Sequence, residues 1–277
     1  MMPIQIIPEE SPRPVQRPNM QRAEKMANPF EAQRKLAESN LKDVGKVIAV
    51  HSGKGGVGKS TFAVNLAATL SHAGFSVGLI DADVDCPSCH KLLGVAERVE
   101  ADSEGRLQPL LSHGIKFLSV GNMVESENSA NIMRGPIMFK LISEMLCKAD
   151  WGKLNYLLID LPPGTGDNPL TIMQIAPLYG LIIVTQPQEV ALVDARKSAN
   201  MAGRMNVPVI GLVENMSGEV FGEGGAEKTA GQLEKIYLGS VPLQKNIREL
   251  SDKGIPAVLE DEKLLGIFKN IIQEAAI

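Results

Sequence analysis

Cysteine is scarce in this 277-residue sequence, which contains only Cys86, Cys89 and Cys147. Three cysteines are too few for a disulfide framework. The sequence also lacks an uninterrupted apolar run of about 18 residues, the length that a membrane-spanning helix needs. Residues 1–20 carry five prolines and no signal-type apolar stretch. We therefore expect a cytoplasmic protein with no membrane partner.

An excess of positive charge is lacking as well. The sequence has 28 Lys and Arg residues against 32 Asp and Glu residues, a formal net charge of -4. Because proteins that bind nucleic acid neutralise its phosphates with Lys and Arg, we expect no nucleic-acid partner. Aromatic residues make up only 4% of a chain that is 44% hydrophobic. This composition favours a parallel sheet of aliphatic strands covered by helices.

Three regions of different composition follow one another. The proline-rich residues 1–20 are predicted to be disordered, because they cannot bury enough apolar surface to become ordered. Residues 21–44 are predicted to form a helical extension, with one or two short helices interrupted near Pro29 and packed loosely before the core. Residues 45–277 are long enough for one large α/β domain and leave little room for another.

Apolar segments of strand length alternate with helical segments in residues 45–277. Strands are predicted at residues 46–50, 75–80, 115–120, 156–159, 181–185 and 209–213. Helices are predicted at residues 60–73, after residue 136, around residue 170, and at residues 190–205 and 225–235. Because strands joined through helices run parallel, this alternation predicts a doubly wound, mostly parallel α/β sheet with helices on both faces.

A glycine-rich segment lies between the first predicted strand and the helix that follows it. It reads Gly53-Lys54-Gly55-Gly56-Val57-Gly58-Lys59-Ser60, followed by Thr61. Glycines let backbone N–H groups approach phosphates, and the helix adds the positive end of its dipole. We expect Lys59 to contact the β- and γ-phosphates of ATP, Ser60 to bind Mg²⁺ and Thr61 to add a further phosphate contact. This motif predicts that residues 45–277 are a P-loop ATPase domain.

Carboxylates follow two of the predicted strands, at the edge of the sheet where ligands bind in such folds. Asp81, Asp83 and Asp85 come after the strand at 75–80, and Asp160 comes after the strand at 156–159. Asp160 is interpreted as the Walker B residue that binds Mg²⁺ with Ser60, and Asp83 as the group that positions the attacking water. For one of the three clustered carboxylates, Asp85 in the first instance, a turn or helix-capping role fits as well.

An additional lysine, Lys54, narrows the class of ATPase. With Lys54 near its start, the loop resembles the deviant Walker A motif of the MinD/ParA/Mrp class of ATPases. This resemblance implies a homodimer in which Lys54 reaches across to the nucleotide of the partner chain. Lys54 would then act in catalysis beside Lys59, Asp83 and Asp160.

Other motifs resemble the Mrp/ApbC iron-sulfur cluster carrier family over roughly residues 46–257. They are Asp81-Ala82-Asp83, Arg134-Gly135-Pro136, Trp151-Gly152, Asp160-Leu161-Pro162-Pro163-Gly164-Thr165-Gly166-Asp167, Val213-Glu214-Asn215-Met216-Ser217, Phe221-Gly222-Glu223-Gly224-Gly225 and Val241-Pro242-Leu243. The resemblance implies a protein that binds and hydrolyses ATP and transfers iron-sulfur clusters to apoproteins. It also implies that Asn215 and the backbone near Pro242 frame the adenine.

The sequence departs from this family at the cluster ligands. Carriers of this family usually have a Cys-x-x-Cys pair just after the Glu-Asn-Met-Ser segment, but residues 217–221 contain no cysteine. A Cys-x-x-Cys pair occurs instead at Cys86 and Cys89. Two such pairs across a dimer would supply the four thiolates of a [4Fe-4S] cluster, although Cys86 and Cys89 also fit a helix start with two half-buried thiols. The alternative function is a dimeric, MinD/ParA-like switch that binds a protein partner without a cluster.

Overall fold

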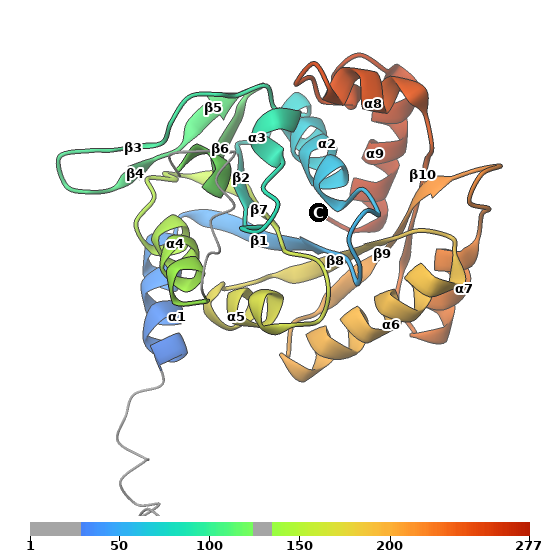
Figure 1. Ribbon diagram of the computed structural model, residues 1–277, viewed down its shortest axis with the longest axis horizontal. Coiled ribbons are helices and arrows are strands. Elements are labelled where there is room, and N and C mark those ends of the chain that lie inside the picture. Colours follow the sequence, from blue (N-terminus) through green and yellow to red (C-terminus); the bar gives the residue numbers. More distant parts are fainter. Residues whose placement is uncertain (1–28, 124–134) are drawn as a thin grey trace, which may run out of the picture.

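The computed structural model describes residues 29–123 and 135–277 (Figure 1). The predicted tail at residues 1–20, the first part of the predicted extension and Arg134 lie outside these residues. Among the described residues, no helix is long and apolar enough to span a membrane.

Eight strands form one sheet in the order β10-β9-β8-β1-β7-β2-β6-β5. All neighbours pair in parallel except the edge strand β5, which is antiparallel to β6. The strands are β1 (Val44–His51), β2 (Val77–Asp81), β5 (Leu110–Ser112), β6 (Ile115–Ser119), β7 (Leu154–Asp160), β8 (Gly180–Thr185), β9 (Val209–Ser217) and β10 (Tyr237–Pro242). The short strands β3 (Glu100–Ala101) and β4 (Leu107–Gln108) form a separate antiparallel pair.

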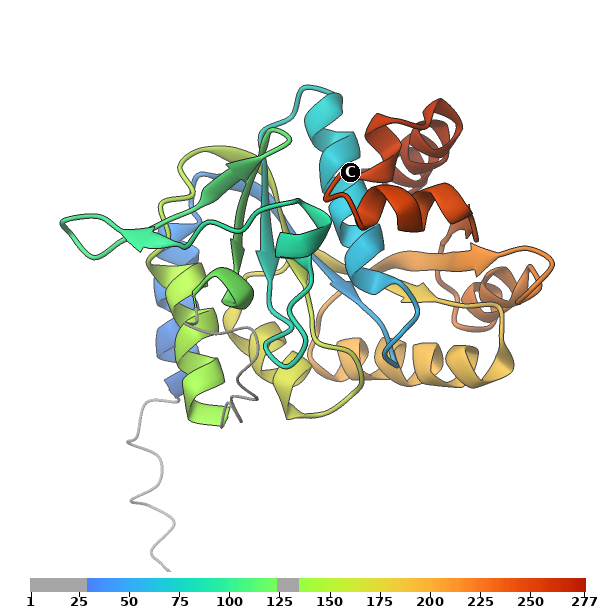
Figure 2. The same cartoon turned by 45° about the horizontal axis from the view of Figure 1, so that its top comes forward.

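Helices cover both faces of the sheet (Figures 1 and 2). One face carries α2 (Lys59–His72), α3 (Cys89–Leu92), α8 (Lys245–Ser251) and α9 (Glu262–Glu274). The other carries α1 (Pro29–Asn40), α4 (Gly135–Cys147), α5 (Asp167–Ile175), α6 (Glu189–Arg204) and α7 (Gly225–Gln232). The structure therefore confirms the predicted doubly wound α/β fold.

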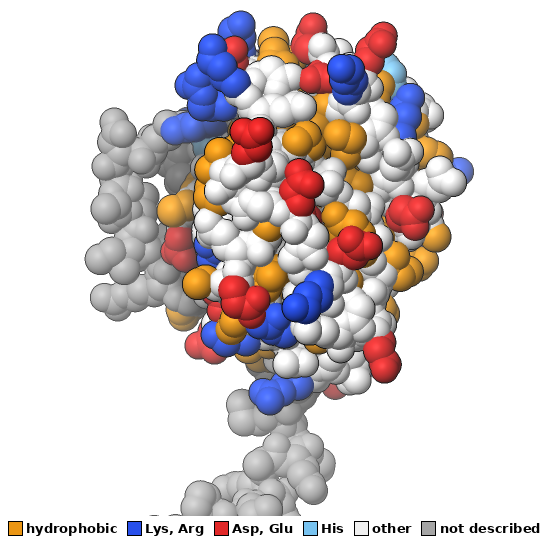
Figure 3. All heavy atoms as spheres, turned by 90° about the vertical axis from the view of Figure 1, so that its right-hand side faces the viewer, with side chains coloured by type: hydrophobic (Ala, Val, Ile, Leu, Met, Phe, Trp, Pro, Cys, Tyr) orange, Lys and Arg blue, Asp and Glu red, His pale blue; other side chains and the backbone are white. Residues whose placement is uncertain are grey.

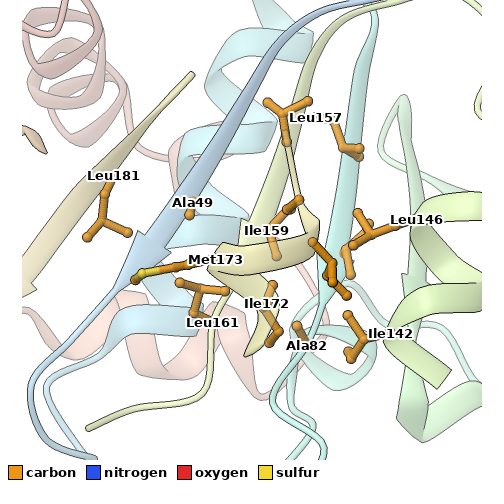
Figure 4. Packing of buried hydrophobic residues seen from close by; sticks show 14 of the residues in the cluster. Ala49, Ala82, Ile142, Leu146, Leu157, Ile159, Leu161, Ile172, Met173 and Leu181 are labelled. Carbon is orange, nitrogen blue, oxygen red and sulfur yellow. The ribbon is translucent and has the colours of Figure 1, made fainter. Parts of the chain in front are cut away.

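Burial on both faces explains why the central strands are almost continuously apolar. Alternate side chains of β7 point to opposite layers: Leu157 and Ile159 join the cluster under α4 and α5, and Leu158 joins the cluster under α2. Figure 4 shows the first of these clusters, where Ile142 and Leu146 of α4 and Ile172 and Met173 of α5 approach the sheet.

Each predicted strand and helix of the domain occurs within a few residues of its expected position, but six further strands and helices are additional. These are the strands β5 and β10, the β3–β4 pair, and the helices α8 and α9. Strand β10 was missed because Gly239, with a φ of 126°, interrupts its apolar pattern. Helix α9 carries a recognisable signal, since its buried Leu264, Phe268 and Ile271 recur at helical spacing.

The loose packing predicted for the N-terminal extension is wrong for α1. Ala37 on this helix and Leu41 just after it are buried in the cluster that α4 and α5 also form. The Asn40 side-chain amide donates to the carbonyl oxygens of Leu146 and Ala149, both at 3.0 Å, at the end of α4 and just beyond it. A helix that buries its apolar face and satisfies backbone acceptors of a neighbour is part of the core.

We predict that Asn40→Ala lowers the free energy of unfolding by about 1 to 2 kcal/mol, because two partly buried carbonyl oxygens lose their donor. Urea denaturation would measure the change. Ser39→Ala, an exposed substitution in the same helix, is the matched control and should change stability by less than about 0.5 kcal/mol. Equal stability of the two variants would contradict the structural role given to α1.

Candidate functional site

The glycine-rich loop connects the end of β1 to the start of α2 at the carboxyl edge of the sheet. At two positions of the loop only glycine fits, because a neighbouring residue approaches the backbone closely. A Cβ atom on Gly53 would lie 2.3 Å from the backbone of Asp194, and one on Gly58, whose φ is 82°, would lie 2.3 Å from the amide nitrogen of Asn215. The loop thus packs closely between α6 and β9, and at Gly53 and Gly58 there is no space for a side chain.

Asp160, at the end of β7, joins the loop to the sheet. Its Oδ1 lies 2.6 Å from the Lys59 ammonium, and its Oδ2 accepts a hydrogen bond of 2.5 Å from the Ser60 hydroxyl. Burial alone would lower the pKa of Lys59, but the charge and hydrogen bond of Asp160 outweigh it and raise this pKa. A hydroxyl and a carboxylate are oxygen ligands of the kind Mg²⁺ takes, so these residues fit a magnesium ion.

The helix-capping role expected first for Asp85 falls to another of the three clustered carboxylates. Asp81 is fully buried, and its Oδ2 accepts hydrogen bonds from the backbone N–H groups of Ser88 and Cys89 and from the Ser119 hydroxyl, at 2.9 to 3.0 Å. Asp81, and not Asp85, therefore caps the start of α3. Burial and the neighbouring charge of Asp160 raise the pKa of Asp81 to about 7. Asp85 is exposed and accepts a 3.4 Å hydrogen bond from Asn168.

Asp83 lies between these groups and the loop. One of its oxygens is 4.0 Å from the Lys59 ammonium, and the other accepts a hydrogen bond from the backbone of Cys86. Burial raises the pKa of Asp83, against the opposing charge of Lys59. The structure thus brings Lys59, Ser60, Asp83 and Asp160 together at one sheet edge.

The two cysteines of the Cys-x-x-Cys pair lie in different environments. Cys86 is exposed, whereas Cys89 is fully buried and its Sγ lies 3.6 Å from Asp160 Oδ2. Burial, together with the charges of Asp81 and Asp160, raises the pKa of the Cys89 thiol well above its usual range. Cys147, at the end of α4, is half-buried and contacts the carbonyl oxygen of Gln33.

Lys54 is placed differently from Lys59. Its side chain is partly exposed, and its ammonium makes no ion pair or hydrogen bond with the described part of the chain. Only its backbone is fixed, through a 2.9 Å hydrogen bond from the Ser52 hydroxyl to the carbonyl oxygen of Lys54. The charge of Lys54 is therefore not neutralised by any group within residues 29–123 and 135–277.

A cavity of about 230 Å³ adjoins the loop, between the start of α2 and the elements after β9. Thr61, Asn215 and Pro242 line it, together with residues of α8 and α9 such as Arg248 and Phe268, which sequence reasoning missed. The Asn215 amide nitrogen donates to the carbonyl oxygen of Val57 at 2.8 Å, so its oxygen is left as an acceptor. A mostly apolar cavity lined by a few side-chain amides, among them the oriented Asn215, is suited to a flat heterocycle.

The surface over α7, β10 and α8 carries no broad basic area among its described residues. Acidic side chains are spread over the middle of this face and the basic ones gather mainly toward its upper and lower parts, with hydrophobic side chains between them (Figure 3). This face thus lacks the continuous positive potential with which proteins hold a nucleic-acid backbone.

A strand, a glycine-rich loop and a helix that present Lys59 and Ser60 to a strand-end aspartate define a P-loop nucleotide-binding protein. The chain belongs to the ParA family: residues 43–276 match the family model described as "NUBPL iron-transfer P-loop NTPase".

Similar proteins of known name agree with this family assignment. An iron-sulfur cluster carrier protein of Methanocaldococcus jannaschii is 45% identical over 246 residues, 84% of this chain and 85% of the relative. The mouse iron-sulfur cluster transfer protein NUBPL is 44% identical over 79% of this chain and 72% of its own length. A nucleotide-binding protein of Archaeoglobus fulgidus, solved in complex with ADP, superposes with a TM-score of 0.72 at 36% identity, covering 82% of this chain and 94% of that one.

His51, the last residue of β1, gives the site a predicted pH dependence. It is fully buried, and burial together with the charge of Lys59 lowers its pKa from 6.5 to about 3. The unfolded chain therefore binds a proton below pH 6.5 that the folded chain does not. Titration of His51 therefore leaves the free energy of unfolding unchanged above pH 6.5. Between pH 6.5 and about 3 it lowers this free energy by about 1.4 kcal/mol for each pH unit that the pH falls.

We predict that the difference in unfolding free energy between the wild type and His51→Asn is constant above pH 7 and shifts in favour of the variant at lower pH. Denaturant unfolding without nucleotide, from pH 8 to about pH 4.5, would measure it. Other carboxylates titrate in both proteins and cancel in the difference. A difference that stays constant down to pH 4.5 would show that His51 is protonated in the folded chain.

Proposed function

We propose that this chain binds and hydrolyses ATP and, as a cytoplasmic homodimer, carries iron-sulfur clusters to apoproteins. The observation that carries the proposal is the contact of Lys59 and Ser60 with Asp160 at the phosphate loop, in a chain of the iron-transfer P-loop NTPase family. Its relatives are named iron-sulfur cluster carrier and transfer proteins, which supports the proposal that iron-sulfur clusters are what the chain carries.

The nucleotide would lie along the loop from Gly53 to Thr61. Lys59 would exchange its contact with Asp160 for the β- and γ-phosphates, and the backbone N–H groups of the loop would hold the phosphate oxygens. Ser60 and Asp160 would hold Mg²⁺, which neutralises phosphate charge when bound. Asp83 would accept a hydrogen bond from the attacking water and orient it.

The base would enter the cavity beside Thr61. Because Asn215 donates its amide hydrogen to Val57, its oxygen is the atom that would accept from the exocyclic amino group of adenine. Pro242 and the backbone around it would form the opposite wall. This arrangement favours adenine over guanine, which presents an acceptor at the corresponding position.

Lys54 supports the homodimer, since its charge has no partner within the described chain. An exposed lysine beside a phosphate-binding loop is suited to the nucleotide of a second chain, where a phosphate supplies the missing negative charge. In such a dimer, hydrolysis and association depend on the same side chain.

Lys54→Ala should lose ATP-dependent association and hydrolysis together while each chain still binds ATP. Lys59→Ala is the contrasting variant. It should weaken ATP binding itself by roughly 10- to 150-fold, the equivalent of about 1.5 to 3 kcal/mol, because it removes a charge-assisted phosphate contact. Sedimentation with a slowly hydrolysed ATP analogue and calorimetric titration would separate the two effects. Normal association and turnover of Lys54→Ala would leave Lys54 as a solvated loop residue.

The cluster ligands proposed here are Cys86 and Cys89, since residues 217–221 contain no cysteine. In the structure, Cys86 is exposed and Cys89 is buried against Asp160. Both thiols can join one cluster only if residues 81–89 turn Cys89 outward. This segment includes Asp83, so nucleotide binding would act directly on the ligands.

The double variant Cys86→Ser, Cys89→Ser should lose the iron and sulfide that the wild type acquires on anaerobic reconstitution, with ATP binding retained. Iron and sulfide per chain, measured with and without ATP, would test this. Cys147→Ser, which changes the remaining cysteine, is the matched control and should keep the cluster. A wild type that takes up no iron would favour the metal-free switch, and iron retained by the double variant would exclude these two ligands.

A further inference from the structure

Three buried side chains from three separate elements converge behind the phosphate loop. They are Asp81 at the end of β2, Cys89 at the start of α3 and Asp160 at the end of β7, and none of them is exposed. Each offers one ligand atom, and the two carboxylate oxygens and the thiol sulfur all lie within 4.8 Å of one another. Cys86, three residues away from Cys89, is exposed and is not part of this group.

Strand pairing and hydrogen bonds hold these three groups together. Asp81 and Asp160 are direct partners in the parallel register of β2 and β7. Cys89 is tied to both: its backbone N–H donates to Asp81 Oδ2 at 3.0 Å, and its thiol approaches Asp160 Oδ2 at 3.6 Å. The ligand set is thus assembled by strand pairing and by the cap of α3, and not by flexible surface side chains.

The chain itself already places a cation against this group. The Lys59 ammonium, only 6% exposed, lies 2.6 Å from Asp160. One ammonium faces two fully buried carboxylates and the nearby Asp83. Buried carboxylates that outnumber the buried cations favour uptake of further positive charge. Asp83, at 4.0 Å, offers Lys59 an alternative partner if Asp160 binds another cation.

The donor set determines which cation fits. Two carboxylate oxygens alone would suit Mg²⁺, but a thiolate is a soft ligand that first-row transition ions accept and Mg²⁺ does not favour. Two oxygens and one sulfur leave a fourth position open in a tetrahedral site. Binding forms a metal–sulfur bond and metal–oxygen bonds, and it releases to solvent the thiol proton and any proton that Asp81 holds, with no change of oxidation state.

We propose that Asp81, Cys89 and Asp160 bind one thiophilic divalent cation, iron(II) in a cell, and that this cation and Mg·ATP exclude each other because both require Asp160. The inference rests on the proposed function: the site would hold a single iron ion while the nucleotide is absent and release it when ATP enters. It differs from a cluster held by Cys86 and Cys89, since Cys86 takes no part.

Cobalt(II) is the probe, because a cobalt–thiolate bond gives an ultraviolet charge-transfer band and tetrahedral cobalt gives visible absorption. The reduced, nucleotide-free full chain is titrated anaerobically. The wild type should develop both features with one cobalt per chain. Cys89→Ser should lose the charge-transfer band and bind cobalt at least about tenfold more weakly, since losing a ligand costs no less than losing an outer-shell partner. Cys86→Ser and Cys147→Ser are matched controls and should keep the band.

A second measurement tests the exclusion. Adding Mg²⁺ with a slowly hydrolysed ATP analogue to the cobalt-loaded wild type should abolish the charge-transfer band, whereas Mg²⁺ alone should not. Circular dichroism establishes that Cys89→Ser is folded, and Cys89→Ala is the second variant if it is not.

The proposal is overturned if the wild type shows no thiolate band, if Cys89→Ser keeps it, or if Cys86→Ser loses it. A band that persists with bound nucleotide overturns the exclusion. Failure of the proposed function can be told apart from failure of this metal site. It would appear as a lack of ATP binding, or as a lack of bound sulfide after reconstitution with iron and sulfide. Neither result depends on the cobalt spectrum.

Discussion

The parallel pairing of β7 with β1 on one side and β2 on the other is the constraint on which the site depends. It sets Asp160 opposite Val50, just before the phosphate loop, and opposite Asp81, the first residue of the segment 81–89. Strand ends in such a sheet lie side by side, so residues more than 70 positions apart meet at one edge. The contacts of Lys59 and Ser60 with Asp160 follow from this register.

Buried charge then links the phosphate loop to residues 81–89. Lys59, Asp160 and Asp81 have almost no contact with water, so their interactions are little screened and no one of them can change partner without affecting the others. In the proposed ATP complex, Lys59 would turn to a phosphate, and Asp160 would exchange the charge of Lys59 for that of Mg²⁺. Asp81 caps α3 by accepting hydrogen bonds from the backbone of Ser88 and Cys89. A change of charge at Asp160 therefore acts through Asp81 on the segment that carries the two cysteines.

Much of the fold was predictable because both faces of the sheet are covered, and this produces strands of continuous apolar residues between turn signals. The glycine loop, Lys59, Ser60 and Asp160 were predictable for a related reason: each occupies a strand end or a helix start. Elements without such patterns could not be predicted from the sequence. Gly239 interrupts the apolar pattern of β10. Helix α1 contacts the core partly through Asn40, a polar residue whose two carbonyl partners, at the end of α4 and just beyond it, are more than 100 positions away.

The sequence by itself determined the fold class, the nucleotide loop and the absence of a cysteine pair after Ser217, because these depend on local composition and on the order of elements. Only the tertiary structure decided which aspartate caps α3, and that Cys89 is buried beside Asp160 while Cys86 faces solvent. It also decided that α8 and α9 close the cavity beside Thr61. These outcomes depend on which strands pair and in what register, and hydrophobic periodicity along the chain carries no information about distances between strand ends.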